Sequence, residues 1–422
     1  MKITVIGLGK LGLPLAVQFA SKNNSVVGLD IDIDRVSEIN LGNSPIREEQ
    51  DLDWKLKEVV DSNHLRAVTD PKYAISDANI IVITVPLITN KEGEADFSII
   101  DSVTESIGSY ITKGTLVCYE TTVPIGTTRN RFGEKIHSLS KYIIGKDIFV
   151  VFSPERVLTG RIFSDLRKYP KIVGGLTENC TLKGIEFYQS VLDFDERSDL
   201  KIANGAWGMD SSEAAEFVKL AETTYRDVNI GLANQFAMHA QHFNIDIQKI
   251  INASNSQPYS HIHQPGISVG GHCIPVYPNL YLMSDNQASI VQEARSTNKN
   301  MPIYFVNSLL EKVNSLRGRK ILVLGISYRP KVKEVAFSGA YDLKEILISL
   351  GALPYFQDPL YTEKEIFELG FDPGKLNNET ELIIIHTAHE EYARIDFTKF
   401  PGLRYILDGR GILGRGIGVI KC

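Results

Sequence analysis

The sequence predicts an α/β protein in which two nucleotide-binding-like parallel sheets are joined by a long helix, and three observations predict it. The first half alternates short apolar runs with helical stretches, which is typical of parallel strands buried on both faces. A helical pattern follows from about residue 210, and roughly thirty residues of helix would span about 45 Å. A second, smaller strand-and-helix alternation starts at Lys320.

The predicted strands end in glycine, aspartate, proline or threonine, as buried strands of a doubly wound sheet often do. We expect three domains, at residues 1–205, 206–300 and 301–422, the middle one helical. The strands of the first sheet are expected at Ile3–Ile6, Val26–Leu29, Ile80–Val85, Leu116–Tyr119 and Ile148–Phe152. Those of the second are expected at Lys320–Gly325, Leu353–Phe356, Leu382–Ile385 and Tyr405–Leu407, after a helical linker that follows Met301.

The long helix has a capping-box-like start at Asp210–Glu213 and a broad apolar face. A helix of this length and width of apolar face usually connects domains and often builds a subunit interface, so we expect a homodimer. The residues of the face are Ala214, Phe217, Val218, Ala221, Tyr225, Val228, Leu232 and Phe236.

Composition narrows the functional class. The 422 residues are 43% hydrophobic and 23% charged, as in soluble globular proteins, and the net charge of −6 argues against nucleic acid as a partner. Neither a signal peptide nor a membrane-spanning stretch is apparent, so no membrane partner is expected. Cys118, Cys180, Cys273 and Cys422 have neither metal-ligand spacing nor a disulfide pattern. We therefore expect a reducing cytoplasm and no metal.

A glycine motif follows the first predicted strand. Gly7 would allow a tight turn, Gly9 would let a pyrophosphate approach the backbone, and Gly12 would allow close packing of helix on strand. Asp30 ends the second strand, where a carboxylate accepts hydrogen bonds from a ribose and repels a 2′-phosphate, so NAD is favoured over NADP. Arg35, one turn further on, either lies over the adenine or is a solvated helix residue.

Two further strand-end loops should face this cofactor, because ligands of open parallel sheets bind beyond the carboxyl ends of the strands. One contains Val85 and Pro86, and the other contains Thr122, which either positions nicotinamide or water or merely caps a turn. The residues assigned to NAD are Gly7, Gly9, Lys10, Leu11, Gly12, Asp30, Arg35, Val85, Pro86 and Thr122.

Three residues carry candidate chemistry. Glu155, after another strand, could activate water as a general base or be an ordinary surface glutamate. Lys219 interrupts the apolar face of the long helix, where an ammonium either stabilises an oxyanion or reaches solvent. Cys273 follows two glycines and His272; it is either a nucleophile activated by basic neighbours or an inert cysteine. A thiol beside a nicotinamide could take an alcohol to an acid in one site.

Together these motifs resemble the UDP-glucose/GDP-mannose dehydrogenase family over essentially the whole chain. The resemblance implies an N-terminal NAD-binding Rossmann domain, a central dimerisation helix and a C-terminal Rossmann-like domain for UDP. It also implies oxidation of a sugar C6 alcohol to a carboxylate with two NAD. The matching stretches are Gly7–Pro14, Thr121–Thr127, Ser153–Gly160, Glu216–Ala233, Pro265–Pro278, Gly325–Arg329 and Asp408–Arg410.

By this resemblance Cys273 forms the thioester, Lys219 stabilises the oxyanion, Glu155 assists hydrolysis and Thr122 lies near the catalytic water. The loops look most like the branch that acts on UDP-N-acetylhexosamines, UDP-N-acetylmannosamine or UDP-N-acetylglucosamine, which serve polysaccharide biosynthesis. The residues expected to bind substrate are Glu155, Lys219, Thr223, Tyr259, His261, Gly266, Gly270, Arg329 and Arg410.

Five positions depart from the family pattern. Tyr277 replaces a usual aspartate and Thr223 a usual asparagine, both of which help place water and oxyanion. Tyr259 stands where this branch often has arginine, Lys10 replaces an aromatic residue, and residues 333–338 lack the usual arginine. These changes imply another sugar, altered water activation or weaker catalysis. A non-catalytic nucleotide-sugar-binding homologue and a two-electron hydroxyacid-type dehydrogenase are the alternatives.

Overall fold

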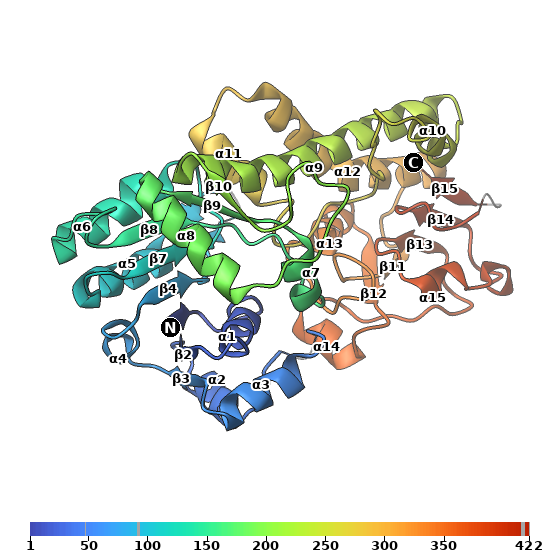
Figure 1. Cartoon of the computed structure of the whole chain (residues 1–422). Helices are drawn as coiled ribbons and strands as arrows, with labels where there is room; N and C mark the ends of the chain where they lie inside the picture. Colours follow the sequence, from blue (N-terminus) through green and yellow to red (C-terminus); the bar gives the residue numbers. More distant parts are fainter. Residues whose placement is uncertain (47, 91–92, 415–417, 422) are drawn as a thin grey trace. The chain divides into compact units, whose positions relative to one another are not determined.

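A computed structural model describes residues 1–46, 48–90, 93–414 and 418–421. The chain divides into two compact units, Met1–Ala221 and Glu222–Cys422, each with its own sheet (Figure 1). The expected α/β class with two Rossmann-like sheets and a long helix is confirmed.

Unit 1 contains an eight-stranded sheet in the order β10-β9-β8-β7-β4-β1-β2-β3. All neighbours are parallel except β8 and β9, which are antiparallel. The strands are β1 Lys2–Ile6, β2 Ser25–Leu29, β3 Leu65–Val68, β4 Ile80–Ile83, β7 Leu116–Tyr119, β8 Phe149–Phe152, β9 Lys171–Gly175 and β10 Ala206–Met209, and a small ribbon pairs β5 Ile88–Thr89 with β6 Ala95–Asp96. The helices are α1 Gly12–Ala20, α2 Ile33–Asn40, α3 Leu52–Asp61, α4 Pro71–Ile75, α5 Ser98–Tyr110, the π-helix η1 Thr128–Gly133, α6 Glu134–Ser140, α7 Ile162–Lys168 and α8 Glu178–Val191.

Both faces of this sheet are buried, as the apolar runs predict. In β4, Ile80 and Val82 belong to one hydrophobic core, whereas Ile81 and Ile83 belong to the other. Strand order reverses direction between β1 and β4, since β2 and β3 lie on one side and β7 and β8 on the other. The carboxyl ends of β1 and β4 therefore form the crevice where ligands of such sheets bind.

Unit 2 contains a five-stranded parallel sheet in the order β12-β11-β13-β14-β15. Its strands are β11 Lys320–Leu324, β12 Leu353–Gln357, β13 Leu382–Ile385, β14 Tyr405–Asp408 and β15 Val419–Lys421. Its helices are α10 Ile247–Ser254, α11 Tyr277–Ser284, α12 Ser289–Val313, α13 Gly339–Ser349, α14 Glu363–Glu368, α15 Glu390–Ala393 and the short 3₁₀ helix η2 Phe397–Lys399. The helix expected after Met301 thus begins earlier, at Ser289.

The long helix is α9, Ser212–His242, with 31 residues (Figure 1). Its start differs in detail from the expected capping box. The hydroxyl of Ser211 accepts a hydrogen bond from the N–H of Ala214, 3.2 Å away, whereas Glu213 forms an ion pair with Arg129. A single serine cap therefore begins the helix, because the glutamate has a stronger, charged partner.

The face of α9 that the sequence singles out is largely open to solvent in the single chain. Phe217, Tyr225, Leu232 and Phe236 are all exposed. The side buried within the chain instead carries smaller residues, Ala215, Leu220, Ala233 and Ala237. Small side chains let neighbouring backbone approach that side closely, and the large apolar residues remain available for another partner.

Candidate active site

The glycine turn of unit 1 has the geometry that a pyrophosphate needs. Gly7 has φ +91° and its N–H donates to the Leu29 carbonyl at 2.8 Å. A Cβ added at Gly12 would lie 1.8 Å from the Gly7 carbonyl oxygen, whereas a Cβ at Gly9 would meet no atom within 4 Å. Gly12 is therefore required for packing, and Gly9 leaves open space. The N-terminus of α1, at Leu11, has no side-chain cap, so its N–H groups suit an anionic ligand.

Asp30, the acid after β2 that is predicted to bind a ribose, also stabilises the glycine turn. The carboxylate of Asp30 is buried and accepts a hydrogen bond from the Leu8 N–H at 2.8 Å. Arg35 forms an ion pair with it at 3.1 Å. Lys10 is exposed on the glycine turn. Turn, acid and arginine thus lie together and fit the adenosine and pyrophosphate of a dinucleotide.

The two other strand-end loops are joined directly. The Thr121 hydroxyl donates to the Val85 carbonyl at 2.5 Å, and Thr122 is buried beside it in sequence. Pro86 is exposed. The carboxylate of Glu216, on α9, accepts hydrogen bonds from the N–H groups of Gly126 and Thr128 at 2.6 and 2.8 Å. Burial outweighs these bonds and raises the pKa of Glu216 to about 7.

Glu155 and Lys219 meet at the end of β8. The Lys219 ammonium donates to the main-chain carbonyl of Glu155 at 2.6 Å. The Glu155 carboxylate itself is almost buried and pairs with Lys171, the first residue of β9, at 2.9 Å. Lys219 does not simply extend into solvent, because its charged end is held against this loop. The predicted oxyanion stabiliser and the predicted base therefore share one local structure.

Several residues that hold these loops have no signal in the motifs. Glu49 is buried and accepts hydrogen bonds from the N–H groups of Gly160 and Ile162 at 2.7 and 2.6 Å, which fixes the loop after Glu155. Glu216 does the same for the loop after Thr122. One signal could have found Glu216: it is a charged residue one turn before Lys219, at i−3 on the same helix. Glu49 lies in an irregular stretch, and nothing in its spacing marks it.

Cys273 lies in unit 2, in a turn before α11. Its thiol is free and half-buried, and its carbonyl accepts from the Tyr277 N–H at 2.8 Å. Gly271 has φ +95° and donates to the Ala336 carbonyl at 2.8 Å. Added Cβ atoms at Gly270 and Gly271 would lie 2.7 and 2.9 Å from the Tyr328 side chain. The two glycines therefore allow the Cys273 loop to pack directly on this tyrosine.

Arg410 is fixed by three acceptors on two loops. Its Nε donates to the His386 carbonyl at 2.6 Å, and its two terminal nitrogens donate to the carbonyl and hydroxyl of Ser268, each at 3.1 Å. A Cβ at Gly266 would lie 2.7 Å from this guanidinium. Burial lowers the pKa of Arg410 to about 10 and that of His386 to about 3, so the imidazole is neutral beside a cation.

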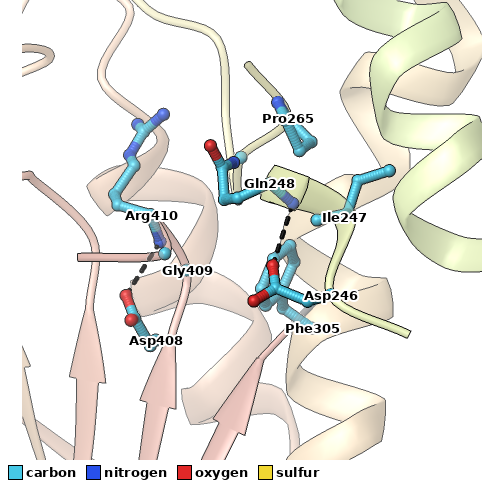
Figure 2. Close-up of a pocket in the computed structure, with 10 residues that line it drawn as sticks. Asp246, Ile247, Gln248, Pro265, Phe305, Asp408, Gly409 and Arg410 are labelled. Atoms are coloured by element: carbon cyan, nitrogen blue, oxygen red, sulfur yellow. Dashed lines mark hydrogen bonds between the residues drawn. The ribbon is translucent and has the colours of Figure 1, made fainter. Parts of the chain in front are cut away.

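A small hollow adjoins this cluster. Figure 2 shows it with Asp408 and Arg410 at the end of β14 and with Asp246 and Gln248 at the start of α10. The Asp246 carboxylate caps that helix by accepting from the Gln248 N–H at 3.0 Å. Polar groups from two elements thus converge on one small space in unit 2.

The remaining predicted substrate residues are more scattered. Arg329 donates from Nε to the Tyr328 hydroxyl at 3.1 Å, so it adjoins the platform of the Cys273 loop. Tyr259 is 93% exposed, and the side chain of His261 is also exposed. Thr223 is buried one turn after Lys219 on α9. The structure therefore groups Arg410 with Gly266, and Arg329 with Gly270, but leaves Tyr259 in solvent.

Unit 2 has a glycine turn like that of unit 1, but the aspartate beside it has additional side-chain partners. Gly325 follows β11 with φ +100°, and its N–H donates to the Gln357 carbonyl at 2.7 Å. The Asp358 carboxylate accepts from the Ile326 N–H at 2.9 Å, as Asp30 does from Leu8. Asp358 also accepts from the Ser327 hydroxyl and faces His389 at 3.2 Å. Burial would raise the pKa of Asp358, but the His389 and backbone hydrogen bonds bring it to about 2.

The described residues show neither a metal-binding cluster nor a helix that could span a membrane. Among them, no group of three or more His, Cys, Asp or Glu side chains is arranged to hold a metal ion. No helix in the same residues is both long and apolar enough to cross a bilayer. Cys118 and Cys180 are buried free thiols, and Cys422 lies outside the described residues.

Comparison with known proteins agrees with this geometry. Models of the UDP-glucose/GDP-mannose dehydrogenase family match the chain with the NAD binding domain at residues 1–192, the central domain at 213–300 and the UDP binding domain at 322–415. The chain belongs to this family. It is an NAD-dependent nucleotide-sugar dehydrogenase, and the expected family, enzyme class and cofactor are confirmed.

Several relatives carry a more specific name. The UDP-N-acetyl-D-mannosamine dehydrogenase of Pyrococcus horikoshii is 32% identical over 99% of both chains. That of Campylobacter jejuni is 32% identical over 94% of this chain and 98% of its own. A solved structure of the Pyrococcus horikoshii UDP-D-ManNAc dehydrogenase covers 100% of this chain and 98% of its own, with 30% identity and a TM-score of 0.89.

Proposed function

We propose that this nucleotide-sugar dehydrogenase oxidises the C6 hydroxyl of a UDP-N-acetylhexosamine, with UDP-N-acetylmannosamine as the leading substrate and UDP-N-acetylglucosamine as the second. The names of the Pyrococcus and Campylobacter relatives support the N-acetylmannosamine assignment. The UDP binding domain supports the nucleotide. The product would be a hexosaminuronate, a building block for polysaccharides.

The glycine turn, Asp30 and Arg35 would hold NAD, which would supply the hydride acceptor for each of two oxidations at C6. The residues of the chain do the rest. Cys273 adds to the C6 aldehyde, and its sulfur then carries the acyl group as a thioester. Lys219 stabilises the C6 oxygen as it gains negative charge, and Glu155 takes a proton from the water that hydrolyses the thioester. Thr122 orients that water.

One observation carries this proposal further than any other. The Lys219 ammonium donates to the main-chain carbonyl of Glu155 at 2.6 Å, so one contact ties the cation to the loop that carries the general base in unit 1. Two groups with these roles need a defined mutual geometry, because a displacement of about 1 Å can reduce catalysis by roughly a hundredfold.

The test measures NADH formed per sugar consumed with UDP-N-acetylmannosamine, UDP-N-acetylglucosamine, UDP-glucose and GDP-mannose. We expect two NADH per UDP-N-acetylmannosamine. Cys273→Ser should lower the rate by at least about a hundredfold, because a serine oxygen is a much weaker nucleophile at neutral pH. Cys180→Ser, a buried cysteine outside the site, is the matched control.

The same measurement separates the alternatives. One NADH per sugar, unaffected by Cys273→Ser, would identify a two-electron dehydrogenase instead. Tight binding of UDP-sugars without any NADH would identify a binding protein, an outcome that the replacements Thr223 and Tyr277 would allow. Activity confined to UDP-glucose would reject the N-acetylhexosamine assignment while leaving the chemistry intact.

We also propose that the exposed face of α9 forms a homodimer and that the enzyme acts in a reducing cytoplasm, with domain boundaries at 1–205, 206–300 and 301–422. Four large apolar side chains on one face of a helix favour a second copy as the partner. Leu232→Asp should convert a dimer into a monomer in light scattering. Ile290→Asp, at an exposed apolar residue on α12, should leave the dimer unchanged. A monomeric wild-type protein would overturn the interface.

A further inference from the structure

A buried group of charged residues lies behind Glu155 in unit 1. Lys171 begins β9 and Glu120 follows β7, and their side chains are only 4% and 0% exposed. Tyr188, on α8, is fully buried against them. Charges are rarely buried to this degree unless they are paired or serve a function, because desolvation costs several kcal/mol per ion.

The contacts within the group are direct. The Lys171 ammonium lies 2.9 Å from a carboxylate oxygen of Glu155 and 3.2 Å from one of Glu120. The Tyr188 hydroxyl donates to the other oxygen of Glu120 at 2.6 Å, and the Lys171 nitrogen is 4.8 Å from the centre of the tyrosine ring. One ammonium is therefore shared by two carboxylates, of which only Glu155 belongs to the predicted chemistry.

The charge balance of this group is unusual. Two ionised carboxylates around one ammonium leave a net charge of −1 in a buried space. Burial raises the pKa of Glu120 to about 7, with the neighbouring Glu155 adding to the rise and Lys171 opposing it. Burial opposes the charge on Lys171, but the two carboxylates outweigh it and raise its pKa, so the lysine stays cationic. A single carboxylate would suffice for a purely structural pair.

Other charged groups also face Glu155. Its second carboxylate oxygen accepts from the Arg156 N–H at 2.9 Å, and Lys219 on α9 holds its carbonyl. Asp165 on α7 and Tyr169 line the same small hollow as Glu155 and Lys171. The thiol of Cys118, on β7, lies close enough to Tyr188 to influence its ionisation. None of these groups replaces Lys171, which has the only ammonium paired with the Glu155 carboxylate among the ion pairs of the described residues.

We propose that Lys171 and Glu120 are positioning residues for thioester hydrolysis: Lys171 fixes the Glu155 carboxylate, and Glu120 draws part of the lysine's charge away so that Glu155 stays basic. This rests on the proposed function of Glu155. In the step concerned, water adds to the thioester carbonyl and gives its proton to Glu155. The carbon–sulfur bond then breaks, the sulfur of Cys273 leaves with the electron pair and the carboxylic acid is formed. No oxidant is needed.

The two residues should act in opposite directions. Replacing Glu120 by glutamine leaves the full lysine charge on Glu155, so the pH at which hydrolysis reaches half its plateau rate falls and the plateau rate also falls. Replacing Lys171 by methionine leaves two carboxylates together without a cation, so one of them holds a proton and the half-plateau pH rises. Lys171→Arg keeps the charge and should restore most of the rate.

The experiment measures the pH dependence of the hydrolysis rate in single turnovers and detects the enzyme-bound acyl group by intact mass. Lys171→Met should slow hydrolysis by at least about tenfold and accumulate the covalent adduct, because general-base catalysis contributes roughly 10²–10⁴-fold. Tyr119→Phe, which removes another buried tyrosine hydroxyl bonded to Thr104, controls for lost stability. It should leave the pH profile unchanged, whereas Tyr188→Phe should shift it.

Superimposable pH profiles for the wild-type enzyme, Glu120→Gln and Lys171→Met would overturn the proposal, whatever their absolute rates. The proposal would also be overturned if Lys171→Arg failed to recover activity and the level of covalent adduct in the Lys171 variants equalled that of the wild-type enzyme. Infrared titration of the carboxyl bands gives a readout without substrate: one carboxyl titrating near neutral pH should disappear in Glu120→Gln. Wild-type protein that forms no NADH would instead refute the proposed function, and the infrared result would still decide whether the pair is coupled.

Discussion

Glu216 is a carboxyl group with a structural task that depends on its protonation. It is fully buried, and both of its oxygens accept hydrogen bonds from backbone N–H groups of Gly126 and Thr128. These bonds hold the loop that carries Thr122. Burial nevertheless raises the pKa of Glu216 from 4.5 to about 7, so the folded chain binds a proton that the unfolded chain releases.

The consequence is a pH dependence of stability with a definite sign. Because the folded pKa is raised, the contribution of Glu216 to folding is fully present below pH 4.5 and is lost as the pH rises through about 7. Glu216→Gln should remove this dependence, which corresponds to about 3 kcal/mol across the window. Urea unfolding of both proteins at several pH values measures the difference. Parallel pH curves for the two proteins would contradict it.

Gly9 and Gly12 lie three residues apart in the same turn and allow a matched comparison, because an added methyl group would meet different surroundings at each. Gly12→Ala places a methyl group 1.8 Å from the Gly7 carbonyl oxygen, so we expect a loss of about 3 kcal/mol or more in stability. Thermal unfolding measures it. A Gly12→Ala protein as stable as the wild type would contradict this prediction, because it would mean that the backbone at Gly7 can move away from the added methyl group without cost.

Gly9→Ala should have the complementary effect. Its methyl group meets no protein atom within 4 Å, so stability should change by less than about 0.5 kcal/mol. The same methyl group would occupy the space in which a pyrophosphate approaches the backbone, so the Kd for NAD should rise at least about tenfold. Calorimetric titration with NAD measures this change. Unaltered NAD affinity would place the pyrophosphate elsewhere.

At the level of elements, the pairing of α9 and α12 within unit 2 depends on polar groups. Asp227 on α9 is fully buried and pairs with Arg295 on α12 at 2.7 Å. Asn298 donates to the same carboxylate at 2.8 Å, and its side-chain oxygen accepts from Asn234 at 2.8 Å. Asn234 in turn accepts from the Gly266 N–H at 2.9 Å. The network thus connects two helices with the loop that precedes Cys273.

Removal of the Asp227 carboxylate should therefore lower the stability of the protein strongly. Asp227→Ala leaves the Arg295 guanidinium and the Asn298 amide without their acceptor, and we expect a loss of about 3–5 kcal/mol in the free energy of unfolding. Glu368→Ala, which breaks the exposed pair with Lys364, should cost less than about 1 kcal/mol. Chemical denaturation compares the two. Equal losses would mean that the buried network contributes little.

At the scale of the whole molecule, the glycine turns after β1 and β11 share a backbone pattern but differ in the partners of their aspartates. In unit 2 the Asp358 carboxylate is occupied by Ser327 and His389. We therefore expect one NAD per chain in calorimetric titration. Asp358→Asn should lower stability without changing NAD affinity, whereas Asp30→Asn should weaken NAD binding. A stoichiometry of two would show that the second turn opens.

The sequence predicts local features of this molecule better than long-range ones. The strands Leu116–Tyr119 and Leu382–Ile385 and the length of α9 follow from periodicity, which is a property of neighbouring residues. The antiparallel placement of β9 and the pairing of Lys171 with Glu120 do not, because they join residues that are distant in sequence. Motif spacing marks Glu155 and Lys219 as candidates, whereas the contacts that hold them become visible only in three dimensions.

In each unit an aspartate accepts a hydrogen bond from the backbone of the glycine turn that follows the unit's first central strand, and this has a consequence for how such proteins diverge in evolution. Asp30 and Asp358 each tie down the backbone of a glycine turn, through the Leu8 and Ile326 N–H groups. Selection for folding alone would retain this acid in a descendant that had lost its nucleotide. An aspartate at the end of the second strand therefore indicates a stable glycine turn, whether or not a dinucleotide binds there. Open space beside the second glycine of the turn is the more specific indicator of dinucleotide binding.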